Sequence, residues 1–265
     1  MSNFCIKDVY TLIYTDTISY WAGKHGWTEE TITTDLDWTA LQWAMDNTSP
    51  AYRRWLLKMA TGFCGTGRMQ LRCRFWNHSR CPRCDQEDET TLHVLRCTHS
   101  EANNEWNKAL CDLDSWMNKY HTQPDLRRAI LTLLIGWHDN DRTLLPSAHR
   151  NRQLFDAIKN QSNIGVYNLL LGRVSRTITA IQDEHLLPME TQMTGTSWTS
   201  KFIRELWKIS WKLWEHRNHK LHGPTLTAHQ LETKQRLLTE LDEELTLGPD
   251  TLCPGDQHLV LGPID

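Results

Sequence analysis

The sequence predicts an all-α protein, a multi-helix bundle interrupted by one small insert. Apolar residues recur at the spacing of amphipathic helices along most of the 265 residues. The 13 tryptophans are spread from Trp21 to Trp214, which suits helices that pack through large aromatic side chains. The insert covers about 64–100, and within it the stretch from Cys81 to Cys97 has three cysteines and a histidine at close spacing. A hydrophobic fraction of 39% is enough for one sizeable core or two modest ones.

The predicted helices follow one another with short breaks. Pro50 interrupts the second helix, because proline lacks the amide proton that a helix interior needs. Pro124 begins another helix, where that loss costs little, and Gly223 with Pro224 ends the longest one. In chain order we expect helices over about 8–22, 35–60, 106–117, 124–137, 146–160, 165–187, 196–222 and 227–245. The expected divisions are an N-terminal helical segment (1–60), a module with the insert (61–100), a helical domain (101–246) and a turn-rich tail (247–265).

The composition and the absence of common motifs exclude several classes of function. The net charge is −3 and the isoelectric point is near 6.5, so the chain is not a polycation that coats nucleic acid unselectively. No segment has the roughly 18 apolar residues that span a bilayer, and the N-terminus lacks the pattern of a secretion signal. We therefore expect an intracellular protein, nuclear or cytoplasmic, without a membrane partner. Phosphate-binding-loop and nucleophile-elbow motifs are absent, so neither a small-molecule substrate nor an enzymatic activity is expected.

Three cysteines and one histidine in the insert have the spacing of a metal site, C-x2-C-x8-H-x3-C. The four residues are Cys81, Cys84, His93 and Cys97. Pro82 suits a tight turn that places the first two sulfurs on one ion. His93 and Cys97 project from one face of a helix, for which Thr90 or Thr91 is the expected N-cap. The set predicts a tetrahedral zinc ion that stabilises structure, because the protein supplies all four ligands and leaves no position for substrate.

Other interpretations of the cluster explain fewer of its residues. A redox Cys-x-x-Cys pair normally lies in a βαβ context and would not account for His93 and Cys97. Unbound thiols are the remaining alternative. A zinc deaminase would need His-x-Glu upstream and a proline directly before the cysteine pair, and this sequence has neither arrangement.

Arginine and lysine concentrate just before and within the insert. Residues 51–84 contain eight of these cations and no Asp or Glu. Cations follow phosphates and aromatic rings stack on unpaired bases, so this basic strip predicts contact with RNA or DNA. We expect phosphate contacts from Arg68, Arg72, Arg74, Arg80 and Arg83, with Phe75 and Trp76 available for base stacking. The module 61–100 is thus expected to be a zinc-binding module with a basic strip.

Two considerations limit this expectation. Charge runs are commonly solvated helix faces, and the arginines have 32 acidic residues in the chain with which to pair. The acidic run DQEDE, which follows Cys84, would repel phosphate. Any nucleic-acid surface is therefore expected on the side of the insert that faces residues 68–83.

The stretch CPRCDQEDETTLHVLRC resembles the zinc-binding domain found C-terminal to the reverse transcriptase of non-LTR (LINE-like) retrotransposons. The pattern of that domain runs Cys-Pro-x-Cys, a short acidic segment, Glu-Thr, His-Val-Leu and a final Cys. Upstream, KMATGFCGTGRMQ is similar to its lysine and glycine-turn segment, and downstream WKLWEHRNHKLHG is similar to its Trp-x-x-Trp-x-x-Arg-Asn helix. The closer match covers about 50–100 and the looser one extends to about 225. The resemblance implies a zinc-dependent module that helps to hold RNA or target DNA, with a reverse transcriptase domain encoded upstream as a partner.

The chain departs from such polyproteins in its catalytic signatures. It has no Ala-Asp-Asp or Tyr-x-Asp-Asp motif, no room for a polymerase before residue 50, and no recognisable nuclease carboxylate set. We therefore expect a non-catalytic zinc-finger protein, resembling a post-polymerase tail, that binds RNA or single-stranded DNA. Two alternatives stay open: a zinc-stabilised structural or protein–protein interaction module, and an inactive retroelement remnant.

Overall fold

The structure is a computed structural model, which describes residues 20, 22–86, 88–141, 151–189, 191–223 and 225–247. Within these residues the regular structure is helical, with no β-strand beyond an isolated bridge between Leu36 and Ser175, which confirms the all-α prediction. The predicted helix 8–22 overlaps the described residues only at Tyr20 and Ala22, and the predicted tail 247–265 overlaps them only at Leu247.

The N-terminal helices are separated by a proline break. The elements are a π-helical turn η1 (Thr31–Asp35), α2 (Trp38–Asp46) and α3 (Pro50–Thr61). The predicted helix 35–60 is therefore split, and Pro50 takes the first position of α3, where its missing amide proton is tolerated. Ser49 caps α3 by accepting a hydrogen bond from the Tyr52 amide at 3.3 Å. Gly62 ends the helix in the left-handed conformation, with φ 77°.

The insert contains two short helices, and longer helices follow it. Their bounds are α4 (Gly67–Arg72), α5 (Thr91–Leu95), α6 (Ser100–Lys119), α7 (Pro124–His138), α8 (Arg152–Ile164), α9 (Val166–Leu170), α10 (Arg176–Leu186), the 3₁₀ turn η2 (Leu187–Met189), α11 (Gly195–His222) and α12 (Thr225–Leu247). The predicted helices 106–117 and 124–137 correspond to α6 and α7. As predicted, Pro124 begins α7, and Gln123 caps it.

The prediction of one continuous helix over 165–187 is wrong, because the chain turns between α9 and α10. Gly172 lies in this turn with φ 86°, a conformation that glycine adopts without strain. A Cβ atom at this position would lie 2.8 Å from Cγ2 of Ile203 and 2.9 Å from Nε1 of Trp207. The turn is thus packed directly against α11, and a tertiary contact decides where the helix stops.

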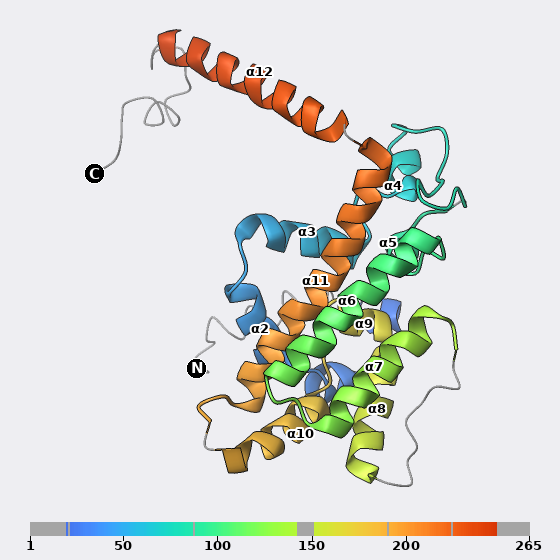
Figure 1. Cartoon of the computed structure of the whole chain (residues 1–265), viewed down its shortest axis with the longest axis vertical. Helices are drawn as coiled ribbons and strands as arrows, with labels where there is room; N and C mark the ends of the chain where they lie inside the picture. Colours follow the sequence, from blue (N-terminus) through green and yellow to red (C-terminus); the bar gives the residue numbers. More distant parts are fainter. Residues whose placement is uncertain are drawn as a thin grey trace, which may run out of the picture. The chain divides into compact units, whose positions relative to one another are not determined.

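Helix α11 lies at the centre of the core. Buried side chains from α2, α3 and α6 to α11 form one hydrophobic cluster, in which Trp106, Trp198 and Trp207 are fully buried. The hydroxyl of Tyr52 on α3 donates to the backbone oxygen of Trp207 at 3.0 Å. Trp116 on α6 lies 6.0 Å, centroid to centroid, from the ring of Trp198, so α6 also packs along α11 (Figure 1). The predicted segment 1–60 and the predicted domain 101–246 therefore share one core where both are described.

The chain divides into two compact units, Met1–Arg217 and Asn218–Asp265. All the core residues named above belong to the first unit. In the second unit the described structure is the end of α11 and the helix α12, whose leucines Leu231, Leu237, Leu238 and Leu241 are exposed. Among the described helices none combines the length and the apolar character that crossing a membrane requires.

Asp37 should contribute to stability in two ways, because it caps α2 and also ties it to α10. Its carboxylate accepts from the Ala40 amide at 2.9 Å and from the Thr179 hydroxyl at 2.7 Å, and the side chain is buried. Asp37→Ala should lower the free energy of unfolding by about 1–3 kcal/mol, measured by urea denaturation. Ser49→Ala removes an exposed cap and should cost less; an equal loss for both variants would contradict the role of the Thr179 bond.

Candidate metal centre

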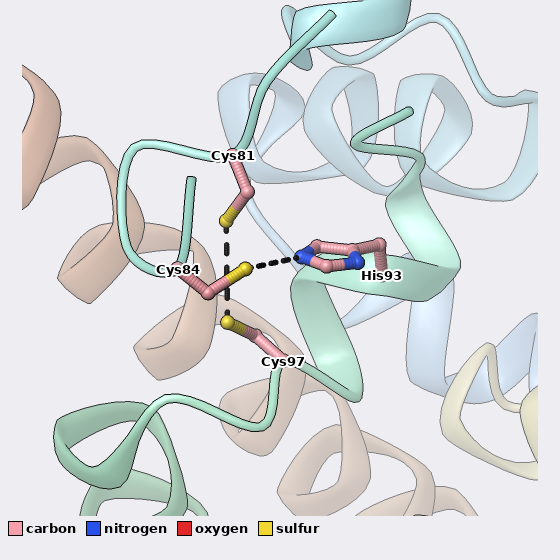
Figure 2. Close-up of side chains that lie close together, drawn as sticks. All are labelled: Cys81, Cys84, His93 and Cys97. Atoms are coloured by element: carbon pink, nitrogen blue, oxygen red, sulfur yellow. Dashed lines mark hydrogen bonds between the residues drawn. The ribbon is translucent and has the colours of Figure 1, made fainter. Parts of the chain in front are cut away.

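The first two ligands of the predicted metal site lie in a tight turn. The amide of Asp85 donates to the backbone oxygen of Cys81 at 2.9 Å, and the amide of Cys81 donates to the backbone oxygen of Gln86 at 2.9 Å. Asp85 has a left-handed φ of 59°, which reverses the chain after Cys84. The turn therefore aims the sulfurs of Cys81 and Cys84 to the same side (Figure 2).

The other two ligands come from α5 and the residues after it. Thr90 caps this helix by accepting a hydrogen bond from the His93 amide at 3.0 Å, as one of the two predicted caps. His93 lies on α5 and Cys97 follows its end, so their side chains converge on the two sulfurs of the turn (Figure 2). The Thr90 cap thus fixes the start of α5 and so helps to position His93 and Cys97.

The geometry of the four side chains fits a tetrahedral metal ion. The ligand atoms of Cys81, Cys84, His93 and Cys97 all lie within 4.8 Å of one another. The sulfurs of Cys81 and Cys97 are 3.9 Å apart, and the Cys84 sulfur is 3.3 Å from Nε2 of His93. Metal–ligand bonds of about 2.0–2.3 Å at tetrahedral angles would separate such atoms by about 3.5–3.8 Å. A disulfide would bring two sulfurs to about 2.05 Å, so the four residues form a group that could hold a metal ion.

The electrostatics of the cluster also suit a cation. The hydrogen bond between Cys81 and Cys97 lowers the pKa of Cys81 and raises the pKa of Cys97. These opposite shifts describe one proton shared by two close sulfurs. Burial raises the pKa of Cys84, because a thiolate there is poorly solvated. A metal ion in their midst would replace the shared proton and stabilise all three thiolates.

The other described cysteines do not join the cluster. Cys64 is buried in the main core, 3.9 Å from the sulfur of Met59, and burial raises its pKa to about 12. Cys73 and Cys111 are exposed. Cys5 and Cys253 lie outside the described residues. Within the described residues the metal-ligand set is therefore the one that the spacing predicted.

A buried ion pair joins the insert to α11. The guanidinium of Arg217 donates from Nε to Oε1 of Glu89 at 3.0 Å and from Nη2 to Oε2 at 2.6 Å. The exposed fractions are 0% for Glu89 and 1% for Arg217. The amide of Gly67, at the start of α4, also donates to Oε2 of Glu89 at 2.7 Å. One carboxylate thus holds together α4, the segment before α5, and α11.

Aromatic rings and backbone bonds complete the surroundings of this pair. The guanidinium carbon of Arg217 lies 5.3 Å from the ring centroid of Trp214 and 5.8 Å from that of Trp76. The backbone of Glu89 donates to Ser79 at 2.8 Å and accepts from Arg68 at 3.1 Å. Trp76, a predicted base-stacking residue, therefore packs on Arg217 and is only partly exposed.

The sequence motifs do not predict that Glu89 and Arg217 form an ion pair. Glu89 is expected only near a helix start, and Arg217 only within a Trp-rich helix. The available signals were the Glu-Thr and Arg-Asn elements of the family resemblance, at Glu89-Thr90 and Arg217-Asn218. Sequence spacing cannot pair residues so far apart, because only the tertiary fold brings them into contact.

The structure separates the predicted phosphate-binding arginines into three groups. Arg83 is buried, with 5% exposed, and its guanidinium donates to the backbone oxygen of Val94 at 2.6 Å. The side chain thus supports α5 from inside the insert and does not present its charge on the surface, where the sequence predicted a phosphate contact. Arg68 forms an ion pair with Asp88, and Arg80 lies 3.8 Å from the carboxylate of Asp85. The acidic run thus folds back onto part of the basic strip.

Arg72 and Arg74 form the third group, and both are exposed. The guanidinium of Arg72 lies 5.9 Å from the ring centroid of Phe63. Arg74 occupies a left-handed turn with φ 59°, and the next residue, Phe75, is 77% exposed. We call Arg72, Arg74 and Phe75, together with Phe63, the α4 turn surface.

Breaking the buried pair should strongly destabilise the first unit. Arg217→Met leaves the Glu89 carboxylate buried without its cation and should lower the free energy of unfolding by about 3–5 kcal/mol. Adding Glu89→Gln to that variant should recover part of the loss, since the unpaired charge is then removed. Urea denaturation followed by circular dichroism measures both effects.

A matched control is the exposed pair between Lys108 and Glu105, whose charged atoms are 2.7 Å apart. Lys108→Met should change the free energy of unfolding by less than about 1 kcal/mol, because water screens an exposed pair. If Arg217→Met were no more destabilising than Lys108→Met, the buried pair would not be the link between insert and core.

Comparison of the chain with protein-family models, with curated proteins and with solved structures found no match. A function must therefore be inferred from the side chains that the fold brings together. The four-residue metal-ligand set, the pair of Glu89 and Arg217, and the α4 turn surface are the features available for that inference.

Proposed function

We propose that this chain is a non-catalytic, zinc-stapled helical protein that binds RNA or single-stranded DNA through the α4 turn surface. The observation that carries the proposal is the exposure of Phe75 beside two exposed arginines, on a turn that precedes Cys81 in the chain. An exposed aromatic ring can stack on an unpaired base while adjacent guanidiniums meet phosphates.

Zinc is the metal that best matches the ligand set. Three thiolates and one imidazole in a tetrahedral arrangement favour Zn²⁺ over hard cations, which prefer oxygen ligands. Cys81 and Cys97 are almost fully buried, and the protein supplies all four ligands. No ligand position is left for substrate or an activated water, so the ion would stabilise the insert and take no part in a reaction.

Backbone hydrogen bonds hold the α4 turn surface in a defined conformation. The amide of Arg74 donates to the backbone oxygen of Leu71 at 3.0 Å, and the amides of Phe75 and Trp76 both donate to Gln70, at 2.9 and 3.3 Å. The turn therefore presents Phe75 outward at little entropic cost on binding. Because Arg83 is buried and Arg68 and Arg80 face acidic partners, the proposed surface is smaller than the strip predicted from sequence.

The family resemblance supports a retroelement origin, as the post-polymerase segment of a non-LTR polyprotein. Two of its separate motifs meet in the fold, since Glu89 belongs to the Glu-Thr element and Arg217 to the Trp-x-x-Trp-x-x-Arg-Asn helix. A reverse transcriptase domain encoded upstream is the partner proposed on this basis. Holding template or target nucleic acid beside such a domain is the role that the surface would serve.

A protein-interaction module is the second candidate, and one observation favours it. Phe63 and Leu71 are exposed in addition to Phe75, so the surface around α4 has an apolar component. Apolar side chains exposed in this way can mark protein contacts. The dependence of binding on salt separates the two candidates, because contacts with phosphate release counterions and apolar contacts do not.

Zinc should be present in stoichiometric amount and should stabilise the fold. Elemental analysis of the purified protein should find one zinc per chain, and a strong chelator should lower the melting temperature. Cys84→Ser should lower both the zinc content and the melting temperature, because a structural site contributes folding free energy.

Cys111→Ser, which changes an exposed cysteine on α6, is the matched control and should change neither quantity. If the Cys84→Ser protein, fully loaded with zinc, melted at the same temperature as the unmodified chain, the site would not be structural. Absence of zinc from the purified protein would remove the basis of the proposal.

Reversing charge on the α4 turn surface should weaken nucleic-acid binding. The Arg72→Glu, Arg74→Glu double variant should bind single-stranded RNA and DNA at least about tenfold more weakly. The slope of log K against log salt should fall by about 0.7 for each phosphate that is no longer neutralised. Phe75→Ala should weaken binding by about 1–3 kcal/mol, with little change in that slope. Fluorescence anisotropy with labelled oligonucleotides over a range of salt concentrations measures these quantities.

The control is Arg128→Glu with Arg152→Glu, which reverses two exposed arginines on α7 and α8. Because the change in net charge is the same, equal losses in the two double variants would show unspecific attraction. If the unmodified protein did not bind either nucleic acid at low salt, the proposed function would be wrong.

A further inference from the structure

A largely apolar cavity of about 610 Å³ lies beside η1, α2, α3 and α11, within the first unit. Its volume is typical of sites that bind small molecules, which range over about 300–1,000 Å³. Residues of the wall include Trp27, Ile32, Trp38, Leu41, Leu171 and Trp207. Trp38 and Leu57, which also lines the cavity, are exposed, so a solute can reach it from solvent.

One cation lies in this apolar wall. Arg173, in the turn between α9 and α10, lines the cavity and is only partly exposed. In the part of the chain that the structure describes, no carboxylate pairs with its guanidinium. A charge in apolar surroundings is costly unless an opposite charge meets it, so the site is suited to an anion.

The guanidinium of Arg173 is already held in position. Its Nη1 donates to Oδ1 of Asn168 at 2.7 Å, and its carbon lies 5.5 Å from the ring centroid of Trp27. Trp27 is anchored in turn, because its indole nitrogen donates to the backbone oxygen of Ile164 at 2.9 Å. A ligand would therefore meet a cation whose side-chain entropy has largely been lost on folding.

A second positive charge, that of Lys24, acts on the same cavity wall as Arg173. Burial lowers the pKa of Arg173 itself, since the charged form is poorly solvated there. The pKa of His25, which also lines the cavity, is lowered by burial and then by the charges of Arg173 and Lys24. Both shifts arise mainly from burial, and at His25 the two positive charges add to it.

A second polar group in the wall lacks a hydrogen-bond partner among the described residues. Trp207 is 1% exposed, and its indole Nε1 has no hydrogen-bond acceptor there. An unsatisfied buried donor is uncommon in folded proteins. The cavity wall thus combines a cation without a carboxylate partner, a donor without an acceptor and a large apolar surface.

We propose that this cavity binds an amphipathic monocarboxylate, whose apolar chain lies among the tryptophans and whose carboxylate pairs with Arg173. The binding is independent of the metal-ligand set and of the α4 turn surface. The apolar wall supplies affinity through burial, and the single guanidinium selects an anionic head group.

Isothermal titration calorimetry of the full chain tests this proposal with three probes of similar tail length: decanoate, decan-1-ol and decyltrimethylammonium. Decanoate should bind at one site per chain and at least about tenfold more tightly than the alcohol, because a charge-assisted hydrogen bond is then formed. The ammonium probe should bind more weakly still. Equal affinity for decanoate and decan-1-ol would overturn the proposal, as would absence of decanoate binding.

Variants locate the site. Arg173→Gln should weaken decanoate binding at least about tenfold while leaving the weaker binding of decan-1-ol unchanged, since only the charge is removed. Arg173→Lys, which keeps the charge, should retain most of the affinity, and Arg152→Gln, which changes an exposed arginine on α8, should have no effect.

Ala60 on α3 lines the cavity, and Ala60→Phe should reduce the binding of both probes by filling it. If any of these proteins failed to fold, as judged by circular dichroism, the comparison of the three probes on the unmodified chain would still decide the question. Undiminished decanoate binding in folded Arg173→Gln would show that the carboxylate is not bound there.

Discussion

The buried ion pair between Glu89 and Arg217 is the constraint on which the arrangement of the insert depends. An isolated charge in a protein interior is costly, so neither residue can be buried without the other. Here the two are held by two parallel hydrogen bonds, and Gly67 supplies a further donor to the carboxylate. The two residues lie on separate elements, and each buried charge needs the other as its partner. The pair therefore fixes the position of the insert on α11.

The metal-ligand set concerns the stability of the insert itself, whereas the ion pair concerns its attachment to the main core. The insert has little hydrophobic core of its own: the buried residues Cys81, Cys97 and Ala102 form a separate cluster of only three members among the described residues. Its helices α4 and α5 are also too short to be stable alone. A metal ion bound by the four ligands would close the insert internally, and the ion pair then attaches the closed insert to the main core.

These two interactions also explain why the basic strip is not a uniform surface. Arg83 is drawn inward to bond with Val94, and Trp76 packs on Arg217, so neither can meet a ligand as a fully exposed side chain would. Asp85 and Asp88 lie near Arg80 and Arg68, because the tight turn after Cys84 brings the acidic run back toward α4. Within the described part of the strip, the α4 turn surface is where exposed cations stand beside an exposed aromatic ring.

Features that depend on neighbouring residues were predictable from local sequence patterns. Helical periodicity predicted α6 and α7, Pro50 predicted a break, Thr90 was among the predicted caps, and the spacing of Cys81 to Cys97 predicted the ligand set. Each of these signals lies within a few residues of the structure that it specifies, so local geometry is enough to interpret it.

Features that need residues far apart in the chain could not be predicted locally, because they depend on how the helices pack. The turn at Gly172 exists because α11 packs against it, the charge of Arg83 is buried because α5 folds over it, and Glu89 meets Arg217 across the insert. The cavity beside Arg173 likewise has walls from four separate elements. A sequence pattern shows the polarity of each side chain, whereas burial and pairing depend on which elements pack together, and that is a property of the whole fold.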